Sequence, residues 1–147
     1  LKVGQWGYRK KKHLRIEADC GGANGNRCWL WKWGLQHLAD EFGLTITVTH
    51  LPTSASKWNP IEHRLFGPIS LNWAGHPLCT FETMLALIRR AATETGLKVE
   101  AYLVNKVYAT GLKVADQVMQ SLNLERHAVC PNWNYTIRPC PAAVACT

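Results

Sequence analysis

The segment LRIEADCGGANGNRCWLWKWGLQHLADEFGLTITVTH, residues 14–50, decides the fold. Residues 14–19 alternate apolar and charged side chains, which is the period-two pattern of a half-buried strand. After a turn rich in glycine and asparagine, apolar side chains recur on one helix face, at Trp31, Leu35, Leu38 and Phe42. Gly43 ends this predicted helix, and residues 44–50 alternate again. The segment therefore predicts a strand, a helix and a second strand.

The two strands of this unit should be parallel, because the helix between them joins them by a right-handed crossover. Asn26 is the expected N-cap of the helix. Ligands of open parallel sheets gather beyond the carboxyl ends of the strands. Asp19 ends the first strand and His50 ends the second, so both should lie at that edge. The loop that follows leaves the same edge and is expected to bring Glu62 to Asp19.

Glu62 has two interpretations within its own segment, SKWNPIEH at residues 56–63. Asn59 has the character of a helix N-cap, and Pro60 suits the first helical position. In a capping box, Glu62 would fold back onto the backbone amide of Asn59. In the other interpretation Glu62 is a catalytic carboxylate. The segment by itself favours the cap, because glutamate is common in the first turn of helices.

The composition limits the class of protein. With 147 residues, of which 47% are hydrophobic and 18% charged, the chain has the size and composition of one globular domain. It has no apolar run of the roughly 18 residues that a membrane span needs. Because no apolar region follows the charged residues at its start, we do not expect these residues to be a secretory signal. The six cysteines form no CxxC pair and no zinc-finger spacing, so we expect reduced thiols.

The net charge of +7 favours a polyanionic partner, for which nucleic acid is the commonest candidate. A basic protein without such a partner would have the same charge, so this alternative stays open. Basic residues crowd into residues 9–15, where they are Arg9, Lys10, Lys11, Lys12, His13 and Arg15. Such a run also suits a solvated linker.

The order of these segments resembles the DDE transposases of insertion sequences, and in particular the subgroup called ISAzo-thirteen. The resemblance spans residues 14–139, and its segments are ADCGGANGNRCWLWKWGLQHLADEFGLTITVTHLP, SKWNPIEHRLF, TGLKV, LNLERHA and NWNYTI. It implies an α/β, ribonuclease-H-like βαβ core that is partial, with C-terminal helices and a short strand. The domains it implies are a basic lead-in at 1–13, a partial catalytic domain at 14–139 and a disordered tail at 140–147.

By this resemblance Asp19 matches the second carboxylate of the family and Glu62 the third, both as catalytic metal ligands. Transfer of DNA phosphodiesters would use two Mg²⁺ or Mn²⁺ ions about 3.5–4 Å apart, one on the attacking oxygen and one on the leaving oxygen. Carboxylate oxygens suit such ions, whereas thiols do not. Water would cut the transposon end, and the freed 3′ hydroxyl would attack target DNA. The resemblance therefore favours a catalytic Glu62.

The first aspartate of the family lies on an earlier strand, and no residue before Asp19 supplies it. The only acid there is Glu17, on the same strand as Asp19. We therefore expect the C-terminal portion of a transposase, as Leu1 in place of Met also hints, which does not cleave DNA alone. A non-catalytic DNA-binding remnant and a relic that does not fold stably are the alternatives. The resemblance also implies a bacterial cytoplasmic, nucleoid-associated protein, with an oligomer on DNA as an option and no membrane partner.

Further residues are candidates for DNA contact, each with a structural alternative: Lys57, Trp58, Arg64, Asn24, Lys10, Lys11 and Lys12. The lysines and the arginine would contact phosphates or be solvated, and Trp58 would stack on a base. Asn24 would bind DNA or cap the helix. Pro68 should kink or end the helix after Glu62, because it lacks an N–H and clashes one turn back.

The rest of the chain predicts fewer functional features. A helix should begin at Thr80 and end at Gly96, followed by a strand at 97–104 and a short helix at 114–122. The cluster at residues 133–135, Trp-Asn-Tyr, is expected to anchor packing.

Overall fold

The computed structural model describes residues 11–141. The chain divides into two compact units, one of residues 1–53 and 111–147 and the other of residues 54–110. Lys10 and the end of the expected tail, residues 142–147, lie outside the described residues. Within residues 11–141 no helix is both long and apolar enough to cross a bilayer.

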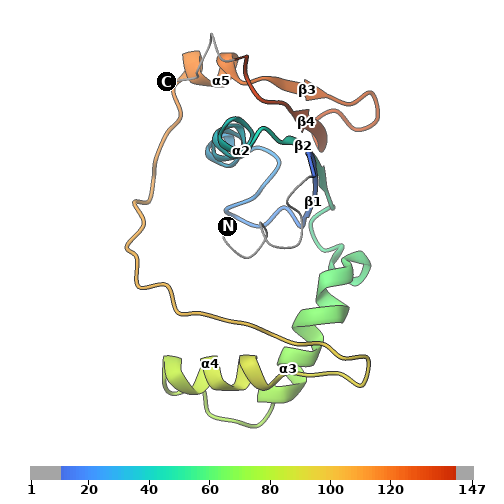
Figure 1. Ribbon diagram of the computed structural model, residues 1–147, viewed down its shortest axis with the longest axis vertical. Coiled ribbons are helices and arrows are strands. Elements are labelled where there is room, and N and C mark those ends of the chain that lie inside the picture. Colours follow the sequence, from blue (N-terminus) through green and yellow to red (C-terminus); the bar gives the residue numbers. More distant parts are fainter. Residues whose placement is uncertain (1–10, 142–147) are drawn as a thin grey trace. The chain divides into compact units, whose positions relative to one another are not determined.

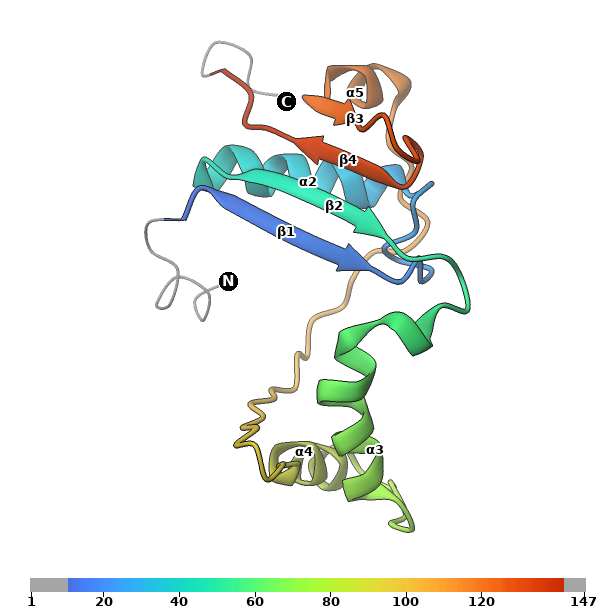
Figure 2. The ribbon, with the colours of Figure 1, turned by 90° about the vertical axis from the view of Figure 1, so that its right-hand side faces the viewer.

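The first unit contains a four-stranded sheet with a long helix against it (Figures 1 and 2). Its strands lie in the order β1-β2-β4-β3, and their bounds are β1 His13–Ala18, β2 Thr45–His50, β4 Asn134–Ile137 and β3 Leu124–Arg126. β1 and β2 pair in parallel, and the other two pairings are antiparallel. The predicted strand–helix–strand unit and the α/β class are therefore confirmed.

The helix of this unit, α2 (Trp29–Phe42), ends where the sequence predicts. Gly43 has φ 61°, a left-handed conformation that glycine adopts without a steric penalty. At the other end, the prediction of Asn26 as the N-cap is wrong, because the cap is Cys28 and it makes no side-chain hydrogen bond. The Cys28 N–H donates to the Gly25 carbonyl at 2.9 Å, so a turn carries the chain past Asn26 before the helix begins.

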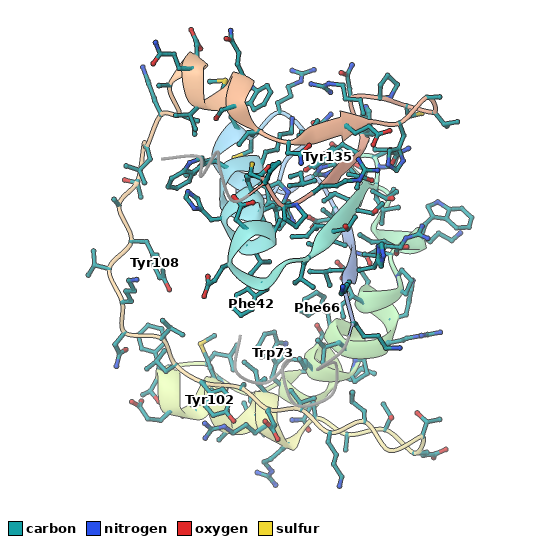
Figure 3. All side chains as sticks on the ribbon, turned by 45° about the horizontal axis from the view of Figure 1, so that its top comes forward. Phe42, Phe66, Trp73, Tyr102, Tyr108 and Tyr135 are labelled. Atoms are coloured by element: carbon teal, nitrogen blue, oxygen red, sulfur yellow. The ribbon has the colours of Figure 1, made fainter. Side chains whose placement is uncertain are left out.

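The core of the first unit lies between α2 and one face of the sheet. The buried side chains of this cluster are Leu35, Ala39, Ile46, Val48, Tyr135 and Ile137. Tyr135, labelled in Figure 3, is fully buried, so the prediction that its cluster anchors packing is confirmed for this residue. The opposite face of the strands is polar, and the hydroxyls of Thr47 and Thr136 there hydrogen-bond at 3.2 Å. Burial on one face is the physical reason for the period-two pattern.

A buried glutamine ties α2 to the later part of the chain. The side chain of Gln36 is 1% exposed. Its Nε2 donates to the Arg138 carbonyl at 2.8 Å and to Asp40 Oδ1 at 2.9 Å. Its Oε1 accepts from the Asn123 N–H at 2.9 Å. The bonds to Arg138 and Asn123 join residues that are 102 and 87 positions apart, and they hold the ends of β3 and β4 against the helix.

The second unit contains only helices and irregular chain. Its elements are the 3₁₀ turn η1 (Ser56–Trp58), the π-helical turn η2 (Glu62–Phe66), α3 (Gly67–Trp73) and α4 (Phe81–Arg90). Asn72 on α3 donates its side-chain N–H to the Leu87 carbonyl on α4, next to buried Ile69 and Leu87. This pair of helices packs through that contact.

Helix α4 begins as predicted and ends earlier than predicted. The Thr80 Oγ1 accepts from the Thr83 N–H at 3.1 Å, which confirms Thr80 as the cap. The predicted end at Gly96 is wrong, since the helix ends at Arg90. Beyond it, Thr93 Oγ1 accepts from the Leu97 N–H at 3.2 Å, a local bond that competes with helical pairing.

The predicted strand at 97–104 is also wrong. Residues 97–110 have no regular secondary structure, and no described strand pairs with them. An alternating pattern makes a strand only where a neighbour supplies the ladder. The predicted short helix at 114–122 is confirmed as α5 (Asp116–Ser121), in the first unit. Cys20, Cys28, Cys79 and Cys130 are free thiols, as expected.

The hydrogen bonds of Gln36 give a test of what holds the first unit together. Gln36→Ala should lower the free energy of unfolding by about 2–4 kcal/mol, because the Asn123 N–H loses its partner and a cavity forms. The matched control on the same helix is Gly34→Ala. Gly34 is exposed and a Cβ there meets nothing within 4 Å, so this change should raise stability by about 0.5–1 kcal/mol.

Chemical denaturation of both variants measures the two effects. An unchanged midpoint for Gln36→Ala would mean that the later strands are held by other contacts.

Candidate active site

Asp19 follows the last residue of β1 at the carboxyl edge of the parallel pair. The register places Ala18 opposite His50, so both strands end at the same level. The Leu51 N–H donates to the Ala18 carbonyl at 2.7 Å, which extends this edge by one more bond. The side chain of Asp19 is exposed there. The prediction that Asp19 and His50 lie at one edge is confirmed.

The carboxylate of Asp19 is held by the turn that follows it. Its Oδ1 accepts from the Gly21 N–H at 3.0 Å and from Asn24 Nδ2 at 3.1 Å. Cys20, between Asp19 and Gly21, has φ 60°, so the chain reverses its direction there. A Cβ on Gly21 would lie 3.2 Å from both Asp19 Oδ1 and Asn24 Oδ1. The turn itself therefore accounts for the glycine at this position.

These hydrogen bonds favour the ionised form of Asp19. The Gly21 N–H, and after it the Asn24 amide, hold the pKa of Asp19 below its ordinary value of 3.8. No hydrogen bond of the described residues uses its Oδ2. Asp19 thus offers an exposed, charged oxygen of the kind that Mg²⁺ and Mn²⁺ bind. In the described part of the chain, no three His, Cys, Asp or Glu side chains group closely enough to hold a metal ion.

Glu62 lies in the second unit, in the first turn of a helix that begins at Pro60. Asn59 Oδ1 accepts from the Ile61 N–H at 3.3 Å, which confirms Asn59 as the cap. The reciprocal half of a capping box is not formed. Among the described residues, no hydrogen bond joins the Glu62 carboxylate to the Asn59 amide. The half-buried carboxylate of Glu62 is therefore not committed to capping.

The helix that carries Glu62 passes Pro68 through a widened turn. The expected kink or stop takes the form of the π turn η2, in which the Gly67 N–H donates to the Glu62 carbonyl five residues back. The helical hydrogen bonds thus change from four to five residues of separation just before Pro68, which has no N–H to donate. A Cβ on Gly67 would lie 3.1 Å from the same carbonyl oxygen, so glycine fits this close approach.

The other predicted DNA-contact residues divide between the two units. In the second, the Lys57 Nζ lies 5.6 Å from the ring centre of Trp58, whose side chain is 72% exposed. The His63 Nε2 hydrogen-bonds to the Lys57 carbonyl at 2.8 Å, and Arg64 is exposed. In the first unit, Lys11 and Lys12 are exposed before β1.

The structure thus brings some of the predicted site residues together and leaves one prediction open. Asp19 and Asn24 meet in the first unit. Glu62 follows Lys57 and Trp58 in the second. The prediction that Asp19 and Glu62 meet stays a prediction.

Sequence reasoning missed a buried polar group beside this edge. Lys32 is 2% exposed, and its Nζ lies 5.4 Å from the ring centre of Tyr135. His50 Nε2 lies 3.2 Å from the Tyr135 hydroxyl, while its Nδ1 is buried without a partner. Burial, and after it the charge of Lys32, lowers the pKa of His50. The sequence did contain a signal for the burial of Lys32. It precedes Leu35 and Ala39 by three and seven positions, so it lies on the same, apolar face of the helix.

An ionised aspartate beyond the carboxyl ends of two parallel strands defines an α/β protein with an acidic site at its sheet edge. The family model described as the Rhodopirellula transposase DDE domain matches residues 1–139, and the chain belongs to that family. The resemblance to DDE transposases of the ISAzo-thirteen subgroup is thereby confirmed. No curated protein and no solved structure matches the chain.

The hydrogen bond from Asn24 gives a test of how the turn controls Asp19. Asn24→Ala should raise the pKa of Asp19 toward 3.8, because the second of its two largest stabilising bonds is lost. Asn26→Ala is the control, since no hydrogen bond joins Asn26 to Asp19 in the described structure. The carboxyl carbon shift in a pH titration by NMR measures both.

The same change has a consequence for stability, with a fixed sign. A depressed pKa stabilises the folded state above about pH 3.8, and this contribution is lost as the pH falls through the folded value. Asn24→Ala should therefore narrow the difference in stability between pH 7 and pH 3. A titration of Asp19 that is identical in the parent and in Asn24→Ala would contradict the assigned bond.

Proposed function

We propose that this chain is the part of a DDE transposase that supplies its second and third catalytic carboxylates, Asp19 and Glu62, within a ribonuclease-H-like fold. The reaction is metal-dependent cleavage of DNA phosphodiesters followed by strand transfer. The observation that carries the proposal is Asp19, ionised and exposed at the carboxyl edge of β1 in a chain that belongs to a transposase DDE family. The parallel β1–α2–β2 unit supports the fold assignment.

The residues of the chain fit a divalent cation by their chemistry. Asp19 would hold it through the oxygen that the turn leaves available, and the turn fixes the direction of that oxygen. Glu62 would hold it with a carboxylate that no capping bond consumes. Two bound Mg²⁺ or Mn²⁺ ions would supply activation of the attacking oxygen and charge stabilisation at the leaving oxygen.

The basic and aromatic residues have a role in holding DNA. Lys57 and Arg64 would contact backbone phosphates, and Trp58 offers an exposed ring on which a base can stack. Lys11 and Lys12, with Lys10, would add phosphate contacts. The net charge of +7 gives this binding a steep dependence on salt. Asn24 is assigned to Asp19 rather than to DNA, because its amide nitrogen donates to that carboxylate.

Cleavage by the intact transposase tests the proposal. Asp19→Asn and Glu62→Gln should each lower Mn²⁺-dependent cleavage by at least about 100-fold, since even changes in the outer shell of a metal site cost 10- to 100-fold. Both should bind DNA within about twofold of the parent. Glu82→Gln, an exposed acid in the first turn of α4, is the matched control and should cleave normally.

The alternative function, a DNA-binding remnant without catalysis, gives a different result. DNA binding would then persist in all four proteins while none of them cleaves. Cleavage that survives Asp19→Asn would contradict the assignment of the second carboxylate.

A further inference from the structure

The first unit has a pocket beside the turn that carries Asp19. Its volume is about 650 Å³, within the range of about 300–1,000 Å³ typical of small-molecule sites. Its lining includes Cys20, the residue after Asp19, and Thr53, which follows β2. Three basic residues line it, namely Arg27, Lys32 and Arg126, and no acidic residue of the described part of the chain does. The pocket is therefore concave and positively charged.

Lys32 is the unusual member of this group. Its side chain is 2% exposed, and no ion pair or hydrogen bond within the described residues compensates its charge. The ring of Trp29 lies 4.5 Å from its Nζ, which offsets part of the cost of burial. A buried ammonium without an anionic partner is rare, because removing it from water is expensive. Burial, and after it the nearby charge of Arg126, lowers the pKa of Lys32.

Arg126 is fixed at the rim of the pocket. One terminal nitrogen, Nη1, donates to the Pro131 carbonyl at 3.0 Å and to Asn132 Oδ1 at 3.2 Å. These bonds orient the guanidinium and leave its other N–H groups for a ligand. Glu125, the neighbouring acid on β3, is paired with Arg138 and is not part of the pocket lining. Two cations thus face one cavity, and each raises the electrostatic cost of the other.

We propose that this pocket binds the phosphate of a single nucleotide unit of DNA, held between Lys32 and Arg126. The proposal rests on the proposed function, because DNA at Asp19 supplies the ligand. A phosphate neutralises both cations at once, and a guanidinium matches its oxygens with paired N–H groups. Trp29 and Trp133 also line the pocket, and their rings suit the base or sugar attached to that phosphate. A nucleotide held here would lie beside Cys20, the residue that follows Asp19.

Binding of thymidine monophosphate to the full 147-residue chain tests the inference. The fluorescence of the pocket tryptophans reports binding, and EDTA is present throughout so that no metal at Asp19 contributes. Thymidine monophosphate should bind at least about tenfold more tightly than thymidine, because the phosphate supplies the charge contacts. Equal binding of the nucleoside and the nucleotide would overturn the proposal.

Two variants and a control identify the residues. Lys32→Met keeps the apolar length of the side chain and removes its charge, and Arg126→Gln changes an exposed residue that folding tolerates. Each should weaken thymidine monophosphate and a short single-stranded DNA by at least about tenfold. Arg90→Gln removes one positive charge at an exposed position on α4 and should change neither affinity by more than about twofold. The melting temperature of Lys32→Met should stay the same or rise, since a buried unpaired charge is lost.

Comparing single-stranded DNA with thymidine monophosphate shows whether the pocket binds a phosphate of DNA or that of a free nucleotide. Weakening of both ligands supports a DNA phosphate in the pocket. Weakening of the free nucleotide alone would overturn the assignment to DNA and leave a nucleotide site. Unchanged affinities in both variants would overturn the pocket altogether. Because EDTA excludes metal, none of these results depends on cleavage, and a failure of the cleavage test would leave them unaffected.

Discussion

The parallel register of β1 with β2 is the constraint on which the first unit depends. It pairs Ala18 with His50 and so brings both strands to one edge, where the turn after β1 presents Asp19. A slip of one residue would move Ile16 and Ala18 from the core face to the polar face. The apolar face against α2 opposes such a slip, because Ile46 and Val48 beside them are fully buried. Packing in the core thereby fixes the position of a carboxylate at the surface.

The buried polar side chains of this unit differ in whether the surrounding residues supply their hydrogen bonds and balance their charge. Gln36 has a partner for each of its polar atoms, and two of its bonds join α2 to residues that are distant in sequence. Lys32 and His50 lie at the carboxyl edge. Among residues 11–141, no anionic side chain pairs with the Lys32 ammonium and no group hydrogen-bonds to the His50 Nδ1. A buried side chain whose polar atoms are all hydrogen-bonded, such as Gln36, suits a structural role, because it stabilises a single packing of the elements around it. Buried polar groups without partners, such as Lys32 and His50 beside the Asp19 turn and the basic pocket, suit ligand binding, because a ligand can supply the partner.

Local periodicity predicted the parts of the fold that are stabilised locally. Residues 14–50 encode two strands, a helix and the left-handed Gly43 in their own pattern, and all were confirmed. The cap at Asn26 was wrong because a turn between Gly25 and Cys28 intervenes. The strand at 97–104 was wrong because a strand needs a partner that its own residues do not specify. β3 and β4 escaped prediction for the converse reason, since short strands of three and four residues depend on β2 and Gln36.

The sequence likewise predicted only part of the candidate site. Asp19 could be found because a strand, a turn and a family resemblance all converge on it, whereas Lys32 was passed over because a lysine on a helix is normally solvated.

The binding of Mn²⁺ to the 147-residue chain tests the central proposal, which is that Asp19 and Glu62 are ligands of the same ion. Titration calorimetry of the parent, Asp19→Asn, Glu62→Gln and the double variant forms a double-mutant cycle. Shared ligation predicts that the double variant binds no more weakly than the weaker single variant. Losses that simply add, or a Glu62→Gln variant with the affinity of the parent, would contradict it.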